Sequence, residues 1–168
     1  MGILKSSLTV RRYDIVGDLS KDYLVDLMNA FDKYAFRHDR ILRSKEENVG
    51  WALIHNLLET EFSEIDRWFY EPFVVAQLRI DQKALPNNLF QAHFRLKCEE
   101  WCKNHDKKHC PSRIKEEFKD NLKFELYSKS LPKVKTVEFC WNLSEKWLLF
   151  HNLSDSMNDR FVKLFYES

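Results

Sequence analysis

Most of the side chains that could do chemistry lie between Lys97 and Lys135, where basic residues outnumber acidic ones. This stretch holds eleven basic and seven acidic residues, a net charge of +4, in a chain whose total net charge is +1. Clustered positive charge attracts phosphate groups, and phosphate contacts supply most of the affinity in non-specific nucleic-acid binding. We therefore take this stretch as the first candidate for a binding surface.

Within this stretch, three lysines follow one another at intervals of four residues: Lys115, Lys119 and Lys123. Residues four apart form one row along a helix, where like charges repel and weaken the helix by roughly 0.2–0.5 kcal/mol per pair. A phosphate backbone would relieve that repulsion. From the charge pattern alone, the commoner outcome is a solvated face with Glu116–Lys119 and Asp120–Lys123 pairs.

Cysteines and histidines gather near one end of the same stretch and raise the question of a metal site. Zinc-binding side chains occur at four positions: Cys98, Cys102, His105 and His109. A single helix cannot wrap four ligands around an ion, and the paired C-x2-C spacing of zinc ribbons is absent. Cys98 also falls on the expected apolar stripe of a helix. We therefore expect no metal, no cofactor and four reduced cysteines.

Catalytic motifs are absent from the sequence, so we expect that the protein is not an enzyme. Its three glycines are isolated and cannot form a phosphate-binding loop. The acidic residues that a magnesium-dependent nuclease would need are scattered and stand outside any motif: Asp66, Glu71, Asp81 and Glu99. Motifs that read bases, such as a helix-turn-helix or a zinc finger, are also missing. Contacts to phosphates rather than to base edges are expected.

Hydrophobic spacing and turn residues predict the elements that must position these side chains. Strands are predicted over Leu4–Ile15, Val49–His55, Phe73–Ile80, Val134–Trp141 and Trp147–Leu153, the last two as a hairpin. Helices are predicted from Ser20 to Phe36, after Leu85-Pro86, after Pro111 with Ser112 as its cap, and after Ser154 or Asp155. The segment Glu59–Glu71 fits either a short helix or an ordered aromatic loop.

The composition indicates one domain with an aromatic core. The 168 residues are 44% hydrophobic and include 13 phenylalanines, six tyrosines and five tryptophans. Only three glycines and four prolines leave little room for linkers. The order of the elements predicts a single α+β domain over residues 1–168, with helices packed on a mixed or antiparallel sheet. No apolar run approaches the roughly 20 residues that span a bilayer, so no membrane partner is expected.

Several short motifs occur in an order typical of one known protein family. They are Val10-Arg11-Arg12-Tyr13, Gly50-Trp51, Arg79 and Lys83 ahead of Leu85-Pro86, and Leu131-Pro132-Lys133 after the charged helices. A strand, a turn, a strand and a final helix follow them. Through these motifs the chain resembles the N-terminal half of the bacterial recombination-associated RdgC family, along nearly all of its length.

The resemblance implies a cytoplasmic, nucleoid-associated protein that binds double-stranded DNA with little sequence preference and has no enzymatic activity. Two subunits in that family close into a ring around the duplex, so a homo-oligomer is implied, as is a role in limiting RecA-driven recombination. We expect six residues to contact DNA: Arg79, Lys83 and Lys133 from motif matches, and Lys115, Lys119 and Lys123 from their spacing.

Two other functions stay open at this point. One is a protein-interaction or assembly module that has lost DNA binding and self-associates through an apolar surface around Trp68-Phe69-Tyr70 or Val134. The other is a metal-dependent nuclease that carries no recognisable motif.

Overall fold

The computed structural model describes residues 9–38 and 47–168, which form two compact units. Within the described residues, the first unit comprises residues 9–38, 49–80 and 134–168, and the second comprises residues 47–48 and 81–133. Six strands and four α-helices in this part of the chain confirm the predicted α+β class. None of these helices is both long enough and apolar enough to cross a membrane.

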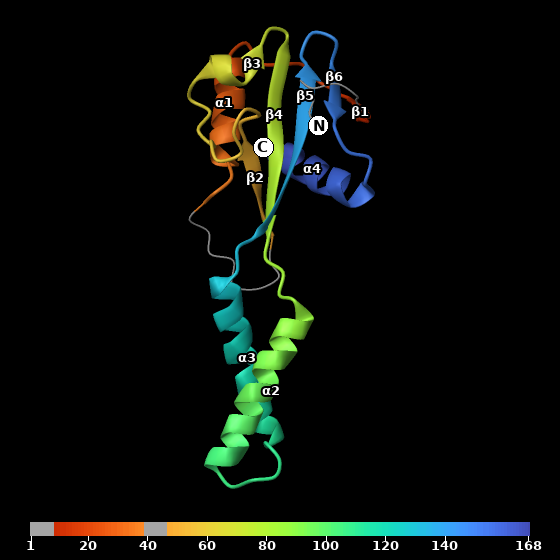
Figure 1. Ribbon diagram of the computed structural model, residues 1–168. Helices are drawn as coiled ribbons and strands as arrows, with labels where there is room; N and C mark the ends of the chain where they lie inside the picture. Colours follow the sequence, from red (N-terminus) through yellow and green to blue (C-terminus); the bar gives the residue numbers. More distant parts are fainter. Residues whose placement is uncertain (1–8, 39–46) are drawn as a thin grey trace. The chain divides into compact units, whose positions relative to one another are not determined.

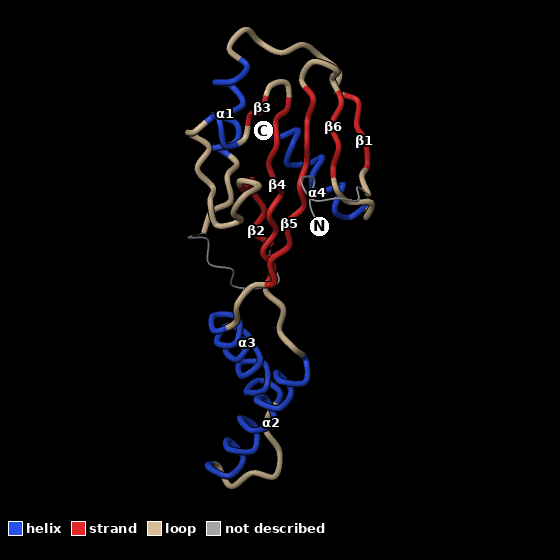
Figure 2. The backbone as a smooth tube through the Cα atoms, turned by 45° about the horizontal axis from the view of Figure 1, so that its top comes forward, coloured by secondary structure: helices blue, strands red, loops and turns tan. Residues whose placement is uncertain are grey.

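The first unit is built on an antiparallel sheet with the strand order β1-β6-β5-β4-β2 (Figure 2). The strands are β1 (Arg11–Asp14), β2 (Glu47–Ala52), β4 (Phe73–Gln82), β5 (Lys133–Asn142) and β6 (Trp147–Phe150), and the short β3 (Phe69–Tyr70) pairs with β4. The predicted hairpin is present, with Asn142 opposite Trp147. Of the predicted first strand, residues 4–8 lie outside the described part of the chain.

Two helices, α1 (Tyr23–Lys33) and α4 (Asp155–Glu167), pack on one face of this sheet (Figure 1). The ring of Phe139 in β5 lies 6.4 Å from that of Phe31 in α1 and 5.4 Å from that of Phe161 in α4, measured between centroids. One strand residue therefore contacts both helices. Ser20 was predicted to cap α1, but its hydroxyl donates a hydrogen bond to the Asp26 carboxylate instead.

The core of this unit is as aromatic as the composition predicted. Its largest side chains are at most 1% exposed: Trp51, Phe62, Trp68, Phe139 and Phe150. Phe31 stacks on Phe62 with ring centroids 4.7 Å apart, and Phe150 stacks on Phe161 at 4.2 Å. Rings of this size bury large apolar areas, so they supply much of the hydrophobic stabilisation of the unit.

The Gly50-Trp51 pair has a steric explanation. The backbone N–H of Phe36 donates to the Trp51 carbonyl at 2.8 Å, and the N–H of Trp51 donates to the Tyr34 carbonyl at 2.9 Å. This pairing brings the backbones so close that a Cβ atom at position 50 would lie 2.5 Å from the Cα of Phe36. Glycine is therefore required at position 50, and the neighbouring Trp51 fills the core.

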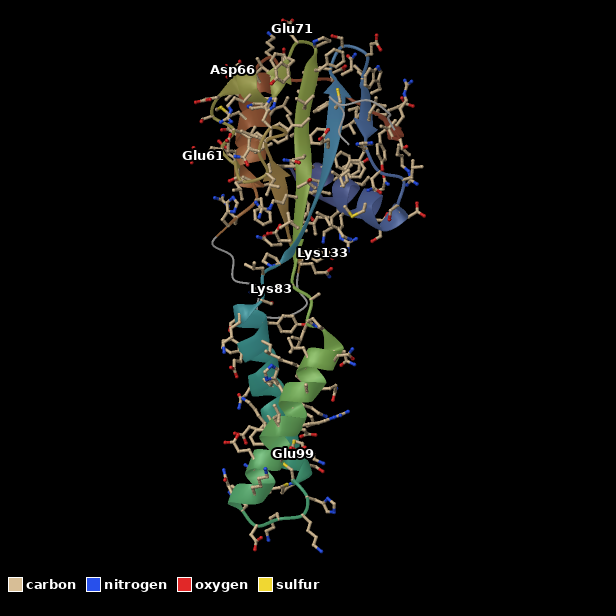
Figure 3. The ribbon with its side chains drawn as sticks, viewed as in Figure 1. Glu61, Asp66, Glu71, Lys83, Glu99 and Lys133 are labelled. Atoms are coloured by element: carbon tan, nitrogen blue, oxygen red, sulfur yellow. The ribbon has the colours of Figure 1, made fainter. Side chains whose placement is uncertain are left out.

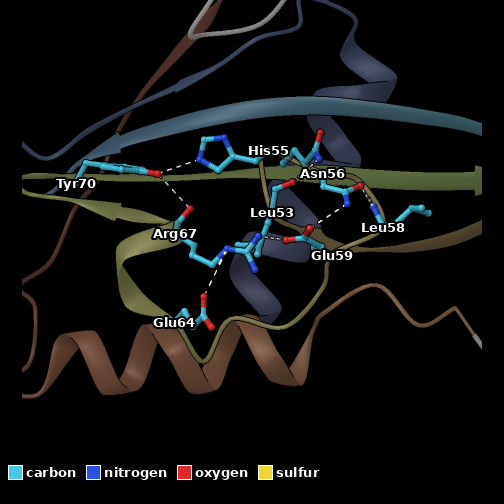
Figure 4. Close-up of polar contacts among 9 residues, drawn as sticks. Leu53, His55, Asn56, Leu58, Glu59, Glu64, Arg67 and Tyr70 are labelled. Carbon is cyan, nitrogen blue, oxygen red and sulfur yellow. Dashed lines mark hydrogen bonds and ion pairs between the residues drawn. The ribbon is translucent and has the colours of Figure 1, made fainter.

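The segment Glu59–Glu71 is an ordered loop that contains one 3-10 turn, η1 (Ile65–Arg67), and then β3, so the helical alternative is wrong. The Asn56 amide accepts a hydrogen bond from the N–H of Leu58 and donates one to the Glu59 carboxylate, each at 3.0 Å (Figure 4). Arg67 pairs with both Glu59 and Glu64. These contacts hold the backbone outside the helical conformation that its apolar spacing allowed.

The second unit is a hairpin of two helices, α2 (Asn87–Asn104) and α3 (Ser112–Lys129). Pro86 and Pro111 stand directly before them, each with φ −60°. Proline is well suited to a helix start because its fixed φ matches the helix and its missing N–H is not needed there. Ser112 is thus the first helical residue rather than the cap, and α3 ends just before Leu131-Pro132, as predicted.

Candidate nucleic-acid interface

A narrow apolar seam holds α2 and α3 together. Phe90 and Leu122 are buried, and Phe90 stacks on Phe94 with centroids 6.2 Å apart and ring planes within 4° of parallel. Lys97 of α2 pairs with Glu125 of α3 at 3.4 Å. In the distal half of the hairpin, residues 94–118, the only buried residue is Cys110. The distal half is therefore thinly packed, and most of its side chains face solvent.

One lysine of the predicted row contacts α2, and a second acts on an α2 side chain electrostatically. The Nζ atom of Lys119 lies 5.5 Å from the centroid of the Phe94 ring, a cation–π contact. Lys115 lies close enough to Cys98 to act on its thiol electrostatically. Lys123 pairs with Asp120 at 3.8 Å and keeps 53% of its side chain exposed. An ion pair so exposed stabilises little, so Lys123 can exchange Asp120 for a phosphate.

Lys83 and Lys133 have different roles although both flank the hairpin in sequence (Figure 3). The half-buried Lys83 donates from Nζ to the backbone oxygen of Tyr127 at 2.6 Å. Carbonyls in the last turn of a helix have no partner within the helix and carry its negative dipole, so this ammonium group stabilises the end of α3. Lys133 is exposed at the start of β5, where a phosphate can reach it.

Arg79 lies in the first unit, and its burial argues against the predicted contact to DNA. It is 5% exposed, donates from Nη1 to the Leu57 carbonyl at 2.7 Å, and has its guanidinium carbon 4.0 Å from the centroid of the Phe36 ring. Gln77, on the same face of β4, donates to the Leu53 carbonyl at 2.6 Å. Both side chains hold the segment after β2 against β4, so we reassign Arg79 to a structural role.

The end of the hairpin carries a second basic group, which the search for helical rows missed. This basic tip consists of four exposed residues that form no ion pair with any described residue: Lys103, Lys107, Lys108 and Arg113. The chain turns through Asp106, whose φ is 48°, and the N–H of Lys107 donates to the Cys102 carbonyl at 3.0 Å. This is a Schellman-type helix end. A count of charges along residues 103–113 would have found the tip.

Charge is divided unevenly between the two units. The sequence ranges of the first, residues 1–38, 49–80 and 134–168, hold 12 basic and 15 acidic residues, a net charge of −3. The remaining residues hold 15 basic and 11 acidic ones, a net charge of +4. Figure 3 labels three of the acidic residues of the first unit, Glu61, Asp66 and Glu71. The nearly neutral chain therefore contains a basic helical unit.

The potential metal ligands are not assembled into a site. No group of three or more His, Cys, Asp or Glu side chains within residues 9–38 and 47–168 is placed to hold a metal ion. His105 instead stacks on Trp101 with centroids 4.2 Å apart, and its Nδ1 hydrogen bonds to the Trp101 carbonyl at 2.9 Å. Among the carboxylates considered for a nuclease, Asp81 is buried and Glu99 is exposed.

The apolar surface considered around Trp68-Phe69-Tyr70 is mostly internal. Trp68 is fully buried, and its indole N–H donates to the Phe62 carbonyl at 2.9 Å. Tyr70 is 45% exposed, and its hydroxyl hydrogen bonds to His55 at 3.0 Å (Figure 4). Val134 is 39% exposed. Each of the two locations therefore exposes a single apolar side chain, Tyr70 in one and Val134 in the other, rather than a continuous apolar patch.

The chain matches no protein-family model and no curated protein. The resemblance to RdgC thus rests on the motifs themselves. Two of them have structural explanations in this chain, since Gly50 permits a close backbone approach and Leu131-Pro132 follows the end of α3.

Proposed function

We propose that the helical hairpin binds double-stranded DNA through its phosphates, without sequence preference and without catalysis. The observation that carries this proposal is the basic tip, Lys103, Lys107, Lys108 and Arg113, which is exposed and has no acidic partner among the described residues. Such cations can pair with DNA phosphates, displacing the counterions that surround the duplex, and that release drives binding. Cations already paired within the protein contribute less.

Four further lysines extend the proposed surface: Lys115, Lys119, Lys123 and Lys133. Arg79 and Lys83 are left out of it, because their cationic groups bind backbone carbonyls within the protein. The sequence lacks a motif for reading base edges, which favours contacts to phosphates. Resemblance to RdgC adds the proposal of a cytoplasmic, nucleoid-associated homo-oligomer that limits RecA-driven recombination.

The first experiment replaces the four cations of the basic tip by glutamine and measures binding to a labelled duplex as salt is varied. The logarithm of the binding constant falls as log salt rises, and each lost phosphate contact makes this slope less negative by about 0.9. The slope of the variant should therefore be less steep by about 3 to 4. The control replaces three exposed lysines of the first unit that lie outside the Lys97–Lys135 stretch, Lys21, Lys33 and Lys163. Equal losses per replaced cation in both variants would show that total charge, and not the hairpin, binds DNA.

The second experiment reverses the charge at Lys115, Lys119 and Lys123 with glutamate. Affinity should fall alike for duplexes of unrelated sequence, because phosphates are common to all of them. Unchanged affinity would remove this row from the interface and leave the basic tip alone.

A gel-shift titration at two salt concentrations, repeated with magnesium, separates the proposal from its alternatives. Retardation that weakens with salt supports DNA binding, whereas degradation of the duplex with magnesium supports a nuclease. The absence of any shift supports an assembly module. The exposed Leu96 and Phe124 of the hairpin, 63% and 60% exposed, favour that module as the second candidate.

A further inference from the structure

A cleft lies between helices α1 and α4 of the first unit. Its volume is about 280 Å³, close to the lower limit of roughly 300–1,000 Å³ for small-molecule sites. Aromatic side chains from both helices and from strands β2 and β5 line its walls: Tyr23, Phe31, Trp51, Trp141 and Phe165. All of them belong to the same compact unit. A mostly apolar cavity of this size fits a small ligand with an apolar body.

The charged side chains that line this cleft are acidic. Asp18 and Asp26 lie on its walls, and no lysine or arginine among the described residues does. Asp18 pairs with Lys146 at 2.7 Å, so a cation already balances its charge. Asp26 accepts a hydrogen bond from the neutral Ser20 hydroxyl and forms no ion pair with any described residue. Its charge, beside aromatic faces that attract cations, favours a positively charged ligand.

A buried hydrogen-bond donor without a partner belongs to the same walls. Trp141 is 8% exposed, and its indole N–H has no hydrogen-bond partner among the described residues. An unpaired buried donor costs free energy, which a ligand that brings an acceptor would recover. Trp141 also lines a second cavity, of about 250 Å³, together with residues 15–19. This additional space allows the ring to turn its N–H toward a ligand in the cleft.

We propose that this cleft binds a small organic amine that has an apolar body and a hydrogen-bond acceptor. The apolar body lies among the aromatic rings, the ammonium group pairs with Asp26, and the acceptor bonds to the Trp141 N–H. Both polar contacts supply what the described residues do not provide, a cation for Asp26 and an acceptor for Trp141. The site lies in the sheet unit, so it is a second function that does not depend on DNA binding by the hairpin.

Three related ligands separate the contributions of the ammonium group and the acceptor. Phenylalaninamide carries both, phenethylamine lacks the carbonyl acceptor, and hydrocinnamamide lacks the ammonium group. The whole chain is titrated with each ligand at about pH 6, where both amines are protonated, and binding is followed by heteronuclear NMR. Phenylalaninamide should bind most tightly and shift the indole N–H resonance of Trp141, which the spectrum of Trp141→Phe assigns. Binding that does not saturate, or equal affinity for all three ligands, would overturn the proposal.

Two substitutions test the two polar contacts. Asp26→Asn removes the charge but keeps the shape of the side chain, so it should weaken both amines roughly tenfold and leave hydrocinnamamide unchanged. Asp22→Asn is the matched control, because Asp22 is exposed just before α1 and does not line the cleft. Trp141→Phe breaks no hydrogen bond among the described residues and should weaken both amides more than phenethylamine. A variant that weakens all three ligands equally, or none of them, would refute the contact that it tests.

Discussion

The sheet unit and the helical hairpin differ in how many side chains they remove from water. The sheet unit buries a continuous aromatic core, in which Trp51, Phe62 and Trp68 are at most 1% exposed. Helix α2 buries only Phe90, and α3 only Leu122 and Tyr127. Since hydrophobic stabilisation grows with buried apolar area, the first unit supplies most of the stability. The second unit, the helical hairpin, buries few side chains and mainly presents charged residues to solvent.

Matched alanine substitutions would break this comparison most directly. Phe139→Ala removes a fully buried ring from the sheet unit and should lower the free energy of unfolding by about 3–5 kcal/mol. Phe94→Ala removes a partly exposed ring from the hairpin and should lower it by roughly 1–2 kcal/mol. Urea denaturation followed by circular dichroism measures both values. Equal losses of unfolding free energy in the two variants would mean that the core of the hairpin stabilises the protein as much as the core of the sheet unit.

Arg79→Met sharpens the distinction between structural and exposed cations. It removes the hydrogen bond to the Leu57 carbonyl and the contact with Phe36, so the free energy of unfolding should fall by about 2 kcal/mol. DNA affinity, measured well below the denaturation midpoint, should stay unchanged. A loss of affinity with intact stability would return Arg79 to the DNA-binding surface.

Lys83→Met tests the distinction between structural and exposed cations in the second unit. Losing the hydrogen bond from Lys83 to the Tyr127 carbonyl should cost about 1 kcal/mol, confined to the last turn of α3. Faster hydrogen exchange at residues 126–130, with unchanged exchange in α1, is the expected observation. Lys129→Met is the matched control, because the side chain of Lys129 is 70% exposed and, among the described residues, pairs only with Glu125 in the same helix. If both variants behaved alike, the helix end would not depend on Lys83.

Asp106→Gly should have the smallest effect, a gain of roughly 0.5–1 kcal/mol in the free energy of unfolding. Glycine adopts the left-handed conformation without strain, and residue 106 has φ 48°. DNA binding should also tighten, because the variant removes the one acidic side chain among the cations of the basic tip. Asp106→Ala removes the same charge but not the strain, so it should tighten DNA binding without adding stability. A gain of stability in both variants would refute the conformational explanation.

The elements that the sequence predicted well are those with strong local signals. Pro86 and Pro111 mark the starts of both hairpin helices, and Leu131-Pro132 marks the end of α3, because proline restricts the backbone whatever surrounds it. Hydrophobic spacing and turn residues likewise located β4 and the hairpin of β5 and β6. Local backbone chemistry decides these boundaries, so they can be read without knowing the tertiary structure.

The candidate site was harder to predict, because exposure depends on residues distant in sequence. Arg79 and Lys83 carry the same charge as Lys119, yet each is bound to a backbone carbonyl that sequence spacing cannot locate. The segment 59–71 has helical apolar spacing, but the contacts of Arg67 hold it as a loop. The basic tip was missed because its cations lie around a turn instead of along one helix face.

The position of the helical hairpin in the chain has a consequence for how such a protein can change over evolutionary time. The hairpin joins the end of β4, at Gln82, to the start of β5, at Lys133, and these two strands are neighbours in the sheet. A tight turn could make the same connection. Insertions or deletions of whole helical turns would therefore alter the reach of the charged surface while strand order and register stay the same. The hairpin is the part of this sequence in which length is free to vary.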